Sequence, residues 1–162
     1  MSKLTHVNRR GETRMVDVSQ KQVTRRRAVA GATIRLTDEI AKAIREDSVA
    51  KGNVLETARI SAIQGAKKTS ELIPLCHPIP ISNISIEFSL TGNVLRLRAE
   101  VSAEAKTGVE MEALTAAAVG CLVVYDMCKG IDKGMVIGPV ELIEKEGGKS
   151  GLYRKPAGKQ NG

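Results

Sequence analysis

The sequence predicts an α+β fold, a ferredoxin-like split β-α-β sandwich in which helices cover one face of an antiparallel sheet. Two segments alternate strictly between apolar and polar residues and are separated by Gly92-Asn93, as in a β-hairpin. Segments before and after this hairpin have the apolar spacing or the alanine content of helices. The predicted order is therefore strand, two helices, two strands, helix and strand, with one helix more than the basic pattern.

The first half of the chain is expected to hold one strand and two helices. Residues 1–24 are polar without a sustained period and are predicted to be a flexible arm. Residues 28–36 are predicted to form a short strand around a central Gly31. A short helix follows, and a long helix is expected over residues 54–73, with Asn53 as its N-cap.

The second half is expected to hold the hairpin, a helix and a last strand. The alternating segments run over residues 84–90 and 95–103. Residues 110–129 are alanine-rich, apolar and free of proline, which predicts a helix. Residues 135–143 form the last predicted strand, and Pro139 within it favours an edge position or a bulge.

Length and composition indicate one soluble domain. The 162 residues suffice for one core, and we place a single catalytic domain at residues 25–151, followed by a loose tail at 152–162. No run approaches the roughly 18 apolar residues that span a bilayer, and the first residues lack a secretory pattern. The three cysteines Cys76, Cys121 and Cys128 are an odd number without Cys-x-x-Cys spacing, so a reducing, cytoplasmic location is expected.

The net charge of +7 points to anionic partners. Proteins that bind single-stranded nucleic acids stack bases on exposed aromatic side chains, and this chain has only one Phe, two Tyr and no Trp. A small polyanion is therefore favoured over nucleic acid or a membrane surface.

Asp126 and Lys129 are three residues apart on the last predicted helix and can lie in contact. Spacing alone favours an exposed ion pair of little energetic value. At a cleft the same pair could move a proton and stabilise a phosphate or an oxyanion.

Glu110 and Glu112 point about 200° apart if both belong to the helix, so we expect that they then cannot share a site. Glu112 and Asp126 are nearly in phase but about 21 Å apart along the axis. Either the substrate is long, or Glu112 meets Asp126 of a neighbouring subunit.

Loop residues supply further candidates. His77 lies in a proline-rich loop and is equally consistent with proton transfer and with a backbone-bonded imidazole. Cys76 is interpreted as structural because no base is spaced to activate it. Lys51-Gly52 and the 147–151 segment combine lysine with glycine, which lets backbone N–H groups approach phosphate. The latter segment is not a Walker A motif, because Ile143 stands where that motif needs glycine.

Six runs of the sequence resemble the molybdenum cofactor biosynthesis protein C (MoaC) family, the cyclic pyranopterin monophosphate synthases. The resemblance covers about residues 4–151 in the family's order. The runs are Met15-Val16-Asp17-Val18-Ser19, Lys51-Gly52-Asn53-Val54, Leu72-Ile73-Pro74-Leu75-Cys76-His77-Pro78, Lys106-Thr107-Gly108-Val109-Glu110-Met111-Glu112-Ala113-Leu114, Tyr125-Asp126-Met127-Cys128-Lys129 and Gly147-Gly148-Lys149-Ser150-Gly151.

The resemblance implies an activity and an assembly. A lyase of this family converts 3′,8-cyclo-7,8-dihydro-GTP, made from GTP by an upstream radical enzyme, into cyclic pyranopterin monophosphate with loss of pyrophosphate. The family assembles as a hexamer, a trimer of dimers, with active sites at dimer interfaces. No cofactor or metal site is expected from the sequence, although Mg²⁺ can accompany the triphosphate.

The resemblance also implies residue roles. Asp126 and Lys129 resemble the catalytic pair, with Lys51 as a further catalytic residue. The implied substrate-binding residues are Leu75, Cys76, His77, Glu110, Met111, Glu112, Lys67, Lys145, Lys149 and Arg26. Asn53, where the family often has Asp, is a mild departure.

Two other hypotheses stay open at this point. A non-catalytic RNA-binding module on the same fold would explain the positive charge, although exposed aromatic residues are few. A purely structural oligomer would explain the smooth, alanine-rich helix.

Overall fold

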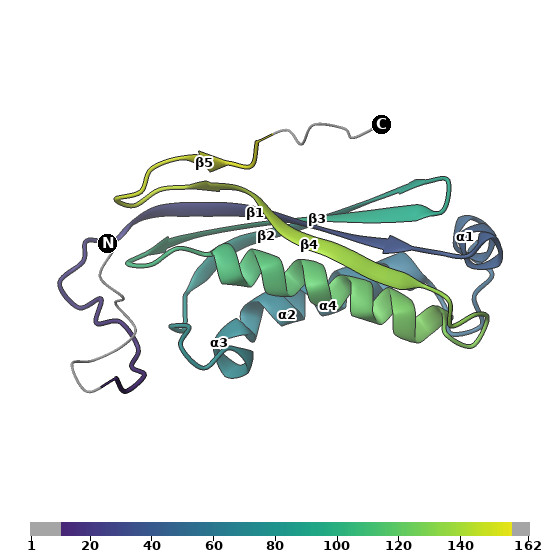
Figure 1. Cartoon of the computed structure of the whole chain (residues 1–162), viewed down its shortest axis with the longest axis horizontal. Coiled ribbons are helices and arrows are strands. Elements are labelled where there is room, and N and C mark those ends of the chain that lie inside the picture. The colour runs from purple at the N-terminus through teal and green to yellow at the C-terminus, as the bar shows by residue number, and fades with distance from the viewer. Residues whose placement is uncertain (1–10, 157–162) are drawn as a thin grey trace.

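The computed structural model describes residues 11–156, which excludes most of the first half of the predicted arm and the end of the predicted tail. Figure 1 shows a sheet with its long helices on one face. The elements in chain order are β1 (Thr24–Arg35), α1 (Asp38–Arg45), α2 (Val54–Lys67), α3 (Thr69–Leu72), β2 (Ile81–Thr91), β3 (Val94–Ala105), α4 (Glu110–Cys128), β4 (Val136–Glu146) and β5 (Tyr153–Arg154).

The sheet has the order β2-β3-β1-β4-β5, and every neighbouring pair is antiparallel. The first four strands thus reproduce the split β-α-β topology, which confirms the predicted ferredoxin-like fold. The hairpin is also confirmed, because Thr91 pairs with Val94 across the turn at Gly92, whose φ of 55° suits glycine.

Strand alternation builds the core. Ala28, Ala30, Ala32 and Ile34 of β1 face the helices and are buried. The β3 residues Leu95, Leu97, Ala99, Val101 and Ala103 are buried in the same core. Small side chains on both strands let α2 and α4 approach the sheet closely.

Helices α2 and α4 pack against each other with little space between them. A Cβ on Gly65 of α2 would lie 3.0 Å from Val119 of α4. A Cβ on Gly120 of α4 would lie 2.2 Å from Leu97 Cδ1. Helix α4 is long and apolar enough to cross a bilayer, but half of it is buried between the sheet and α2, as in a core helix of a globular domain.

Several predicted boundaries differ from the structure. The predicted helix over residues 54–73 is wrong as one element, because α2 ends at Lys67 and the short α3 follows. Buried Thr69 causes this break locally, since its hydroxyl donates to the carbonyls of Gly65 and Ala66. Asn53 caps α2 as predicted, and its Oδ1 accepts from the Glu56 N–H at 2.9 Å.

Strand β4 is irregular near Pro139 and longer than predicted. The register between β1 and β4 shifts between Ala32 and Ile34, opposite Pro139, which confirms the predicted irregularity. The strand continues to Glu146, three residues beyond its predicted end. Tyr153 and Arg154 then pair with it as β5, a strand that the sequence pattern does not predict.

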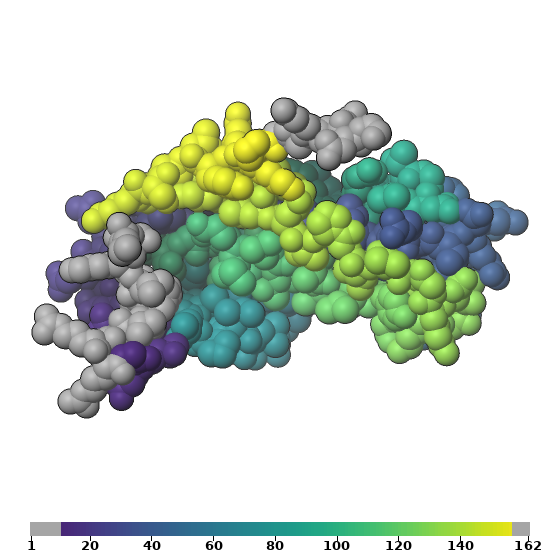
Figure 2. Space-filling view, in the orientation of Figure 1, coloured from purple at the N-terminus to yellow at the C-terminus, as the bar shows by residue number. Residues whose placement is uncertain are grey.

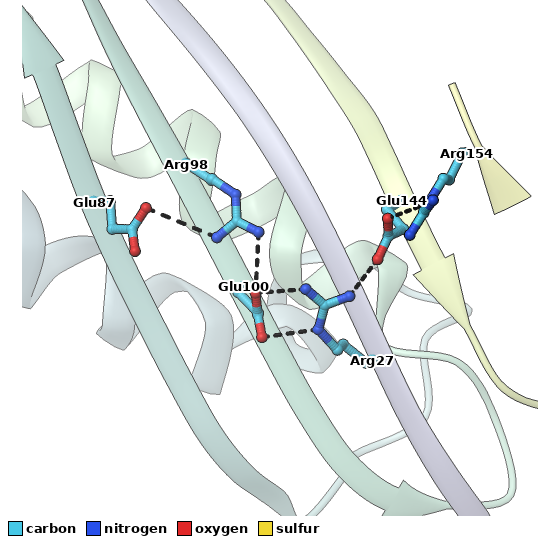
Figure 3. Close-up of polar contacts among 6 residues, drawn as sticks. All are labelled: Arg27, Glu87, Arg98, Glu100, Glu144 and Arg154. Atoms are coloured by element: carbon cyan, nitrogen blue, oxygen red, sulfur yellow. Dashed lines mark hydrogen bonds and ion pairs between the residues drawn. The ribbon is translucent and has the colours of Figure 1, made fainter. Parts of the chain in front are cut away.

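The sheet face opposite the helices carries charged side chains. Figure 3 shows six of them in one row across the five strands. Arg27 binds Glu100 at 2.8 Å and also contacts Glu144. Arg27 lowers the pKa of Glu100, and Arg154 and then Arg27 lower the pKa of Glu144. The row therefore connects all five strands on this face.

Candidate active site

The predicted site residues gather at opposite ends of α4. In Figure 1 the β3–α4 and β4–β5 connections lie at one end of the molecule, whereas α1 and the C-terminus of α4 lie at the other. The helix has 19 residues, so its ends are roughly 27 Å apart. Within one chain, the structure therefore brings the candidates together as two groups and not as one.

The first group is an exposed cluster of Lys51, Asp126 and Lys129. Lys129 Nζ lies 2.6 Å from Asp126 Oδ1, and Lys51 Nζ lies 3.1 Å from Asp126 Oδ2. Lys51 also donates to the Asp126 carbonyl at 2.8 Å. The loop before α2 supplies Lys51, and the antiparallel packing of α2 and α4 brings this loop to the end of α4.

Charge pairing sets the protonation of this cluster. Lys129 and then Lys51 lower the pKa of Asp126, while Asp126 raises the pKa of Lys129. The carboxylate is therefore ionised at neutral pH and can accept a proton, and two ammonium groups stand beside it to stabilise negative charge. More than half of the Asp126 side chain is exposed, so the cluster is open to a ligand or to another chain.

The second group surrounds two adjoining cavities at the other end of α4. The first, here called the Glu112 cavity, has a volume of about 410 Å³. Its lining residues are Val16, Val18, Lys21, Leu75, Cys76, His77, Ile79, Thr107, Gly108, Glu110, Met111 and Glu112.

Glu112 is the most unusual residue of this cavity. It is only 3% exposed, and its Oε2 atom has no hydrogen-bond partner among the residues that the structure describes. Burial, with a contribution from the charge of Glu110, raises the pKa of Glu112 to about 7. A carboxyl group that is half protonated near neutral pH can donate or accept a proton toward a bound ligand.

Glu110 lines the same cavity, so the expectation that two helical residues at this spacing cannot share a site is wrong. Glu110 is the first residue of α4, and its carboxylate folds back over Gly108. A Cβ on Gly108 would lie 1.8 Å from Glu110 Oε2, so only glycine leaves room for this conformation. The side chain thereby reaches the cavity from the helix end, where the angular argument no longer applies.

Cys76 and His77 enter the Glu112 cavity from the loop between α3 and β2. Burial, and to a smaller extent the charge of Glu112, raise the pKa of the Cys76 thiol. A thiol with a raised pKa is a poor nucleophile at neutral pH, which agrees with the structural interpretation of Cys76.

The second cavity, here called the lysine cavity, has a volume of about 760 Å³. It shares Lys21, Thr107, Gly108 and Glu110 with the Glu112 cavity, so the two adjoin. Its basic residues are Lys21, Arg26, Lys106, Lys145 and Lys149, and Glu110 is its one acidic residue among those that the structure describes. Such a surplus of positive charge fits a polyanion.

Backbone geometry brings Arg26 and the β4–β5 loop together. Arg26 donates to the carbonyl of Ala105 at 3.3 Å, and a Cβ on Gly148 would lie 1.8 Å from its guanidinium. Gly147 and Gly148 both have positive φ values, which glycine adopts without strain. The loop can therefore lie directly on Arg26 and present Lys149 to the cavity.

Two lysines of the cavities are not among the residues predicted from the sequence, and one predicted lysine lies outside both cavities. Lys21 lines both cavities, and Lys106 lines the lysine cavity while its Nζ donates to the Ser19 carbonyl at 2.7 Å. The only signal for them was their position in or beside the runs that carry the family resemblance. Lys67 is exposed at the end of α2 and lines neither cavity.

Between the two groups, α4 presents an outward stripe with an apolar middle. Met111, Thr115, Ala118, Leu122 and Asp126 recur at helical spacing, and Leu122 is 58% exposed. The surface view shows α4 uncovered between β4 and the α2–α3 region (Figure 2). Met111 and Asp126 are equally distant from the midpoint of the stripe, as are Thr115 and Leu122.

Across residues 11–156, no group of three or more His, Cys, Asp or Glu side chains is placed to hold a metal ion.

The fold and the cavities define a class: a ferredoxin-like α+β domain with a cationic cavity beside a buried, titratable carboxyl group. The chain belongs to the MoaC family, whose sequence model matches residues 15–148.

Curated relatives agree with this assignment over nearly the full length. A protein of Staphylococcus aureus named cyclic pyranopterin monophosphate synthase is 47% identical, with 98% of this chain and 99% of the relative covered. A protein of the same name from Staphylococcus haemolyticus is 49% identical, with 96% of this chain and 100% of the relative covered.

Proposed function

We propose that this chain is a cyclic pyranopterin monophosphate synthase. The observation that carries the proposal is the sequence identity of 47–49% to relatives of that name over almost the whole chain. In chemical terms the enzyme is a lyase. It converts 3′,8-cyclo-7,8-dihydro-GTP into cyclic pyranopterin monophosphate and pyrophosphate, an early step of molybdenum cofactor biosynthesis. The comparisons give no support to the RNA-binding alternative.

The two adjoining cavities support a particular orientation of this substrate. The lysine cavity offers five cationic side chains to the triphosphate. The Glu112 cavity offers a protonatable carboxyl group, an imidazole and apolar walls to the purine-derived ring. The sugar then lies at the junction of the cavities, next to Glu110 and Thr107.

Asp126, Lys129 and Lys51 supply the remaining chemistry. In the cyclisation, a sugar hydroxyl attacks the α-phosphorus, a new O–P bond forms, and the bond to the pyrophosphate oxygen breaks. The ionised Asp126 accepts the hydroxyl proton, and lysines neutralise the charge that develops on the phosphoryl and leaving-group oxygens. A magnesium ion can accompany the triphosphate into the lysine cavity.

A complete site requires two subunits. Asp126 and Glu112 are roughly 21 Å apart along the axis of α4, too far to act on one small substrate. If two α4 stripes pair antiparallel about a two-fold axis near Ala118, Asp126 of each chain approaches Met111 and Glu112 of the other. The exposed Leu122 and the small Ala118 suit close contact between such helices. Three such dimers would form the expected hexamer.

The remaining proposals concern the source of the substrate, the cellular compartment and the extent of the catalytic domain. The substrate comes from a radical enzyme that acts on GTP, and the cytoplasm is the compartment in which we place the reaction. The domain at residues 25–151 carries the catalysis, and the arm before it contributes Val16, Val18 and Lys21 to the cavity walls.

The activity is tested with purified protein and enzymatically prepared 3′,8-cyclo-7,8-dihydro-GTP, by measuring pyrophosphate release and the oxidised pterin product. Asp126→Ala and Lys129→Ala should each lower product formation by at least a hundredfold. Because both side chains are exposed, the thermal midpoint and oligomeric state should remain close to wild type. Wild-type rates in either variant would refute the site assignment, and an inactive wild type would refute the function.

The shared site is tested by subunit mixing. Inactive Glu112→Gln and inactive Asp126→Ala proteins are denatured together, refolded and checked for mixed oligomers by mass spectrometry. Each mixed dimer then holds one intact site and one doubly altered site, so random pairing restores about a quarter of wild-type activity. Mixed oligomers without any recovery would show that both residues act from one chain.

A further inference from the structure

The β4–β5 loop is held at both ends, although three of its residues are glycines with positive φ. Gly147, Gly148 and Gly151 have φ values of 102°, 73° and 61°. Glycine has more conformational freedom in an unfolded or unanchored segment than other residues, so such a loop needs external contacts to stay in one conformation. Within the loop itself, one backbone bond joins the Gly151 N–H to the Gly148 carbonyl at 3.1 Å.

Strand β4 anchors the first end of the loop, and strand β5 anchors the second end. Its residues pair with β4, where Arg154 lies opposite Glu144 and Tyr153 opposite Lys145. The Lys155 N–H donates to the Ile143 carbonyl at 2.8 Å, and the Lys155 side chain contacts Glu141. The short strand is thus fixed by both backbone and side-chain contacts.

Arg154 connects this anchor to the rest of the sheet. Its Nε donates to Glu144 Oε2 at 2.7 Å, and the other oxygen of Glu144 accepts from Arg27. Figure 3 shows that the row continues through Glu100 and Arg98 to Glu87, so alternating charges link β5 to β2.

The row lies directly behind the lysine cavity. Adjacent residues of a strand point to opposite faces of the sheet. Arg27 and Glu144 belong to the charged face, whereas their neighbours Arg26 and Lys145 line the cavity. A contact that fixes Glu144 and β5 on one face therefore also restricts the residues that present cations on the other.

We propose that Arg154 is a positioning residue for the lysine cavity: by pairing with Glu144 it holds β5 on the sheet and fixes the 147–152 loop that carries Lys149. The inference rests on the proposed function in one respect, because it takes the lysine cavity as the site of the triphosphate. Arg154 itself does not line that cavity. Without this contact the Lys149 side chain is still present, but its loop is not ordered in advance. Each binding event then includes the free-energy cost of ordering the loop.

The test measures binding of inorganic tripolyphosphate to the full-length protein by calorimetry, together with KM and kcat. Arg154→Ala should weaken tripolyphosphate binding about threefold to tenfold and raise KM similarly, with kcat nearly unchanged. Arg154→Lys keeps a cation within reach of Glu144 and should recover most of the affinity. Hydrogen exchange should show faster exchange of the 147–152 amides in Arg154→Ala only.

Arg96→Ala is the matched control for charge. Arg96 is an exposed arginine on the same sheet face, and it forms no ion pair within the part of the chain that the structure describes. If Arg154 acted only through the net charge of the protein, Arg96→Ala would weaken binding equally. Equal effects of the two variants would therefore overturn the proposal.

A double-mutant cycle separates positioning from independent binding. Lys149→Ala should weaken tripolyphosphate binding by itself, and adding Arg154→Ala should then have a clearly smaller effect than in the wild type. Fully multiplicative effects would overturn the positioning role. Failure of wild-type protein to bind tripolyphosphate would instead refute the phosphate assignment of the cavity, and with it this inference.

Discussion

At the scale of single residues, the proposed mechanism divides the acid–base chemistry between two carboxyl groups with opposite environments. Asp126 is exposed between two lysines, which lower its pKa. Glu112 is buried and its pKa rises to about 7. Two carboxyl groups whose pKa values move apart can act as base and acid at the same pH. The environment supplied by the fold, and not the residue type, sets this division.

Glu112 should make the stability of the protein depend on pH. Its folded pKa of about 7 exceeds its ordinary value of 4.5, so the folded state holds a proton that the unfolded state has lost between these values. The stabilising contribution is complete below about pH 4.5 and disappears as the pH rises through 7. The Glu112→Gln variant remains neutral and should gain on the order of 1–3 kcal/mol relative to wild type between pH 5 and pH 8.

Urea denaturation of both proteins across this pH range measures the effect. His77→Gln serves as a control from the same cavity wall, and it should leave the Glu112-dependent change in place. A difference between wild type and Glu112→Gln that does not vary with pH would show that Glu112 is ionised throughout.

At the scale of elements, contact between α4 and the sheet depends on the missing side chain of Gly120. Its Cβ position is already occupied by Leu97, which is 2% exposed and cannot move freely. This close packing holds α4 in place, and α4 in turn carries Glu112 and Asp126 at its two ends.

The Gly120→Ala variant should therefore be less stable than wild type. Overpacking costs about 1–3 kcal/mol, which exceeds the roughly 1 kcal/mol that alanine gains in helix propensity. Gly130→Ala is the control, because a Cβ there meets no atom of the described chain within 4 Å and should change stability by less than about 0.5 kcal/mol. Equal free energies of unfolding for Gly120→Ala and wild type would mean that Leu97 relaxes without cost.

At the scale of the whole molecule, the proposed function implies that a single chain is incomplete as an enzyme, because its two groups of candidate residues lie at opposite ends of α4. The apolar middle of the stripe separates them, and pairing of two stripes joins them while covering Leu122. Assembly and catalysis are then properties of the same surface.

Leu122→Glu should accordingly disrupt assembly and activity together, because pairing of the two stripes would bury two unpaired carboxylates, one on each side of the two-fold axis. Analytical ultracentrifugation should show a smaller particle, and product formation should fall at least tenfold. Val136→Glu alters a residue of comparable exposure, 49% against 58%, away from the stripe and should preserve both properties. A fully assembled, active Leu122→Glu protein would place the interface elsewhere.

Local patterns in the sequence determine most of the fold. Alternation over the hairpin, the cap at Asn53 and the apolar length of α4 each depend on neighbouring residues, and the structure confirms all three. The split of the 54–73 helix depends on the burial of Thr69 in the folded chain, and the short β5 depends on its pairing with β4. No local pattern records such contacts.

The sequence by itself determined the ferredoxin-like topology and the resemblance to the MoaC family, because periodicity and motif runs are linear properties. Only the tertiary structure decided that Glu110 shares a cavity with Glu112, that Lys21 lines both cavities, and that β5 forms the edge of the sheet beside β4. The physical reason is that cavities, burial and the resulting pKa values arise from residues far apart in the chain. For Glu112 in particular, the raised pKa comes first from burial, which the folded chain alone provides.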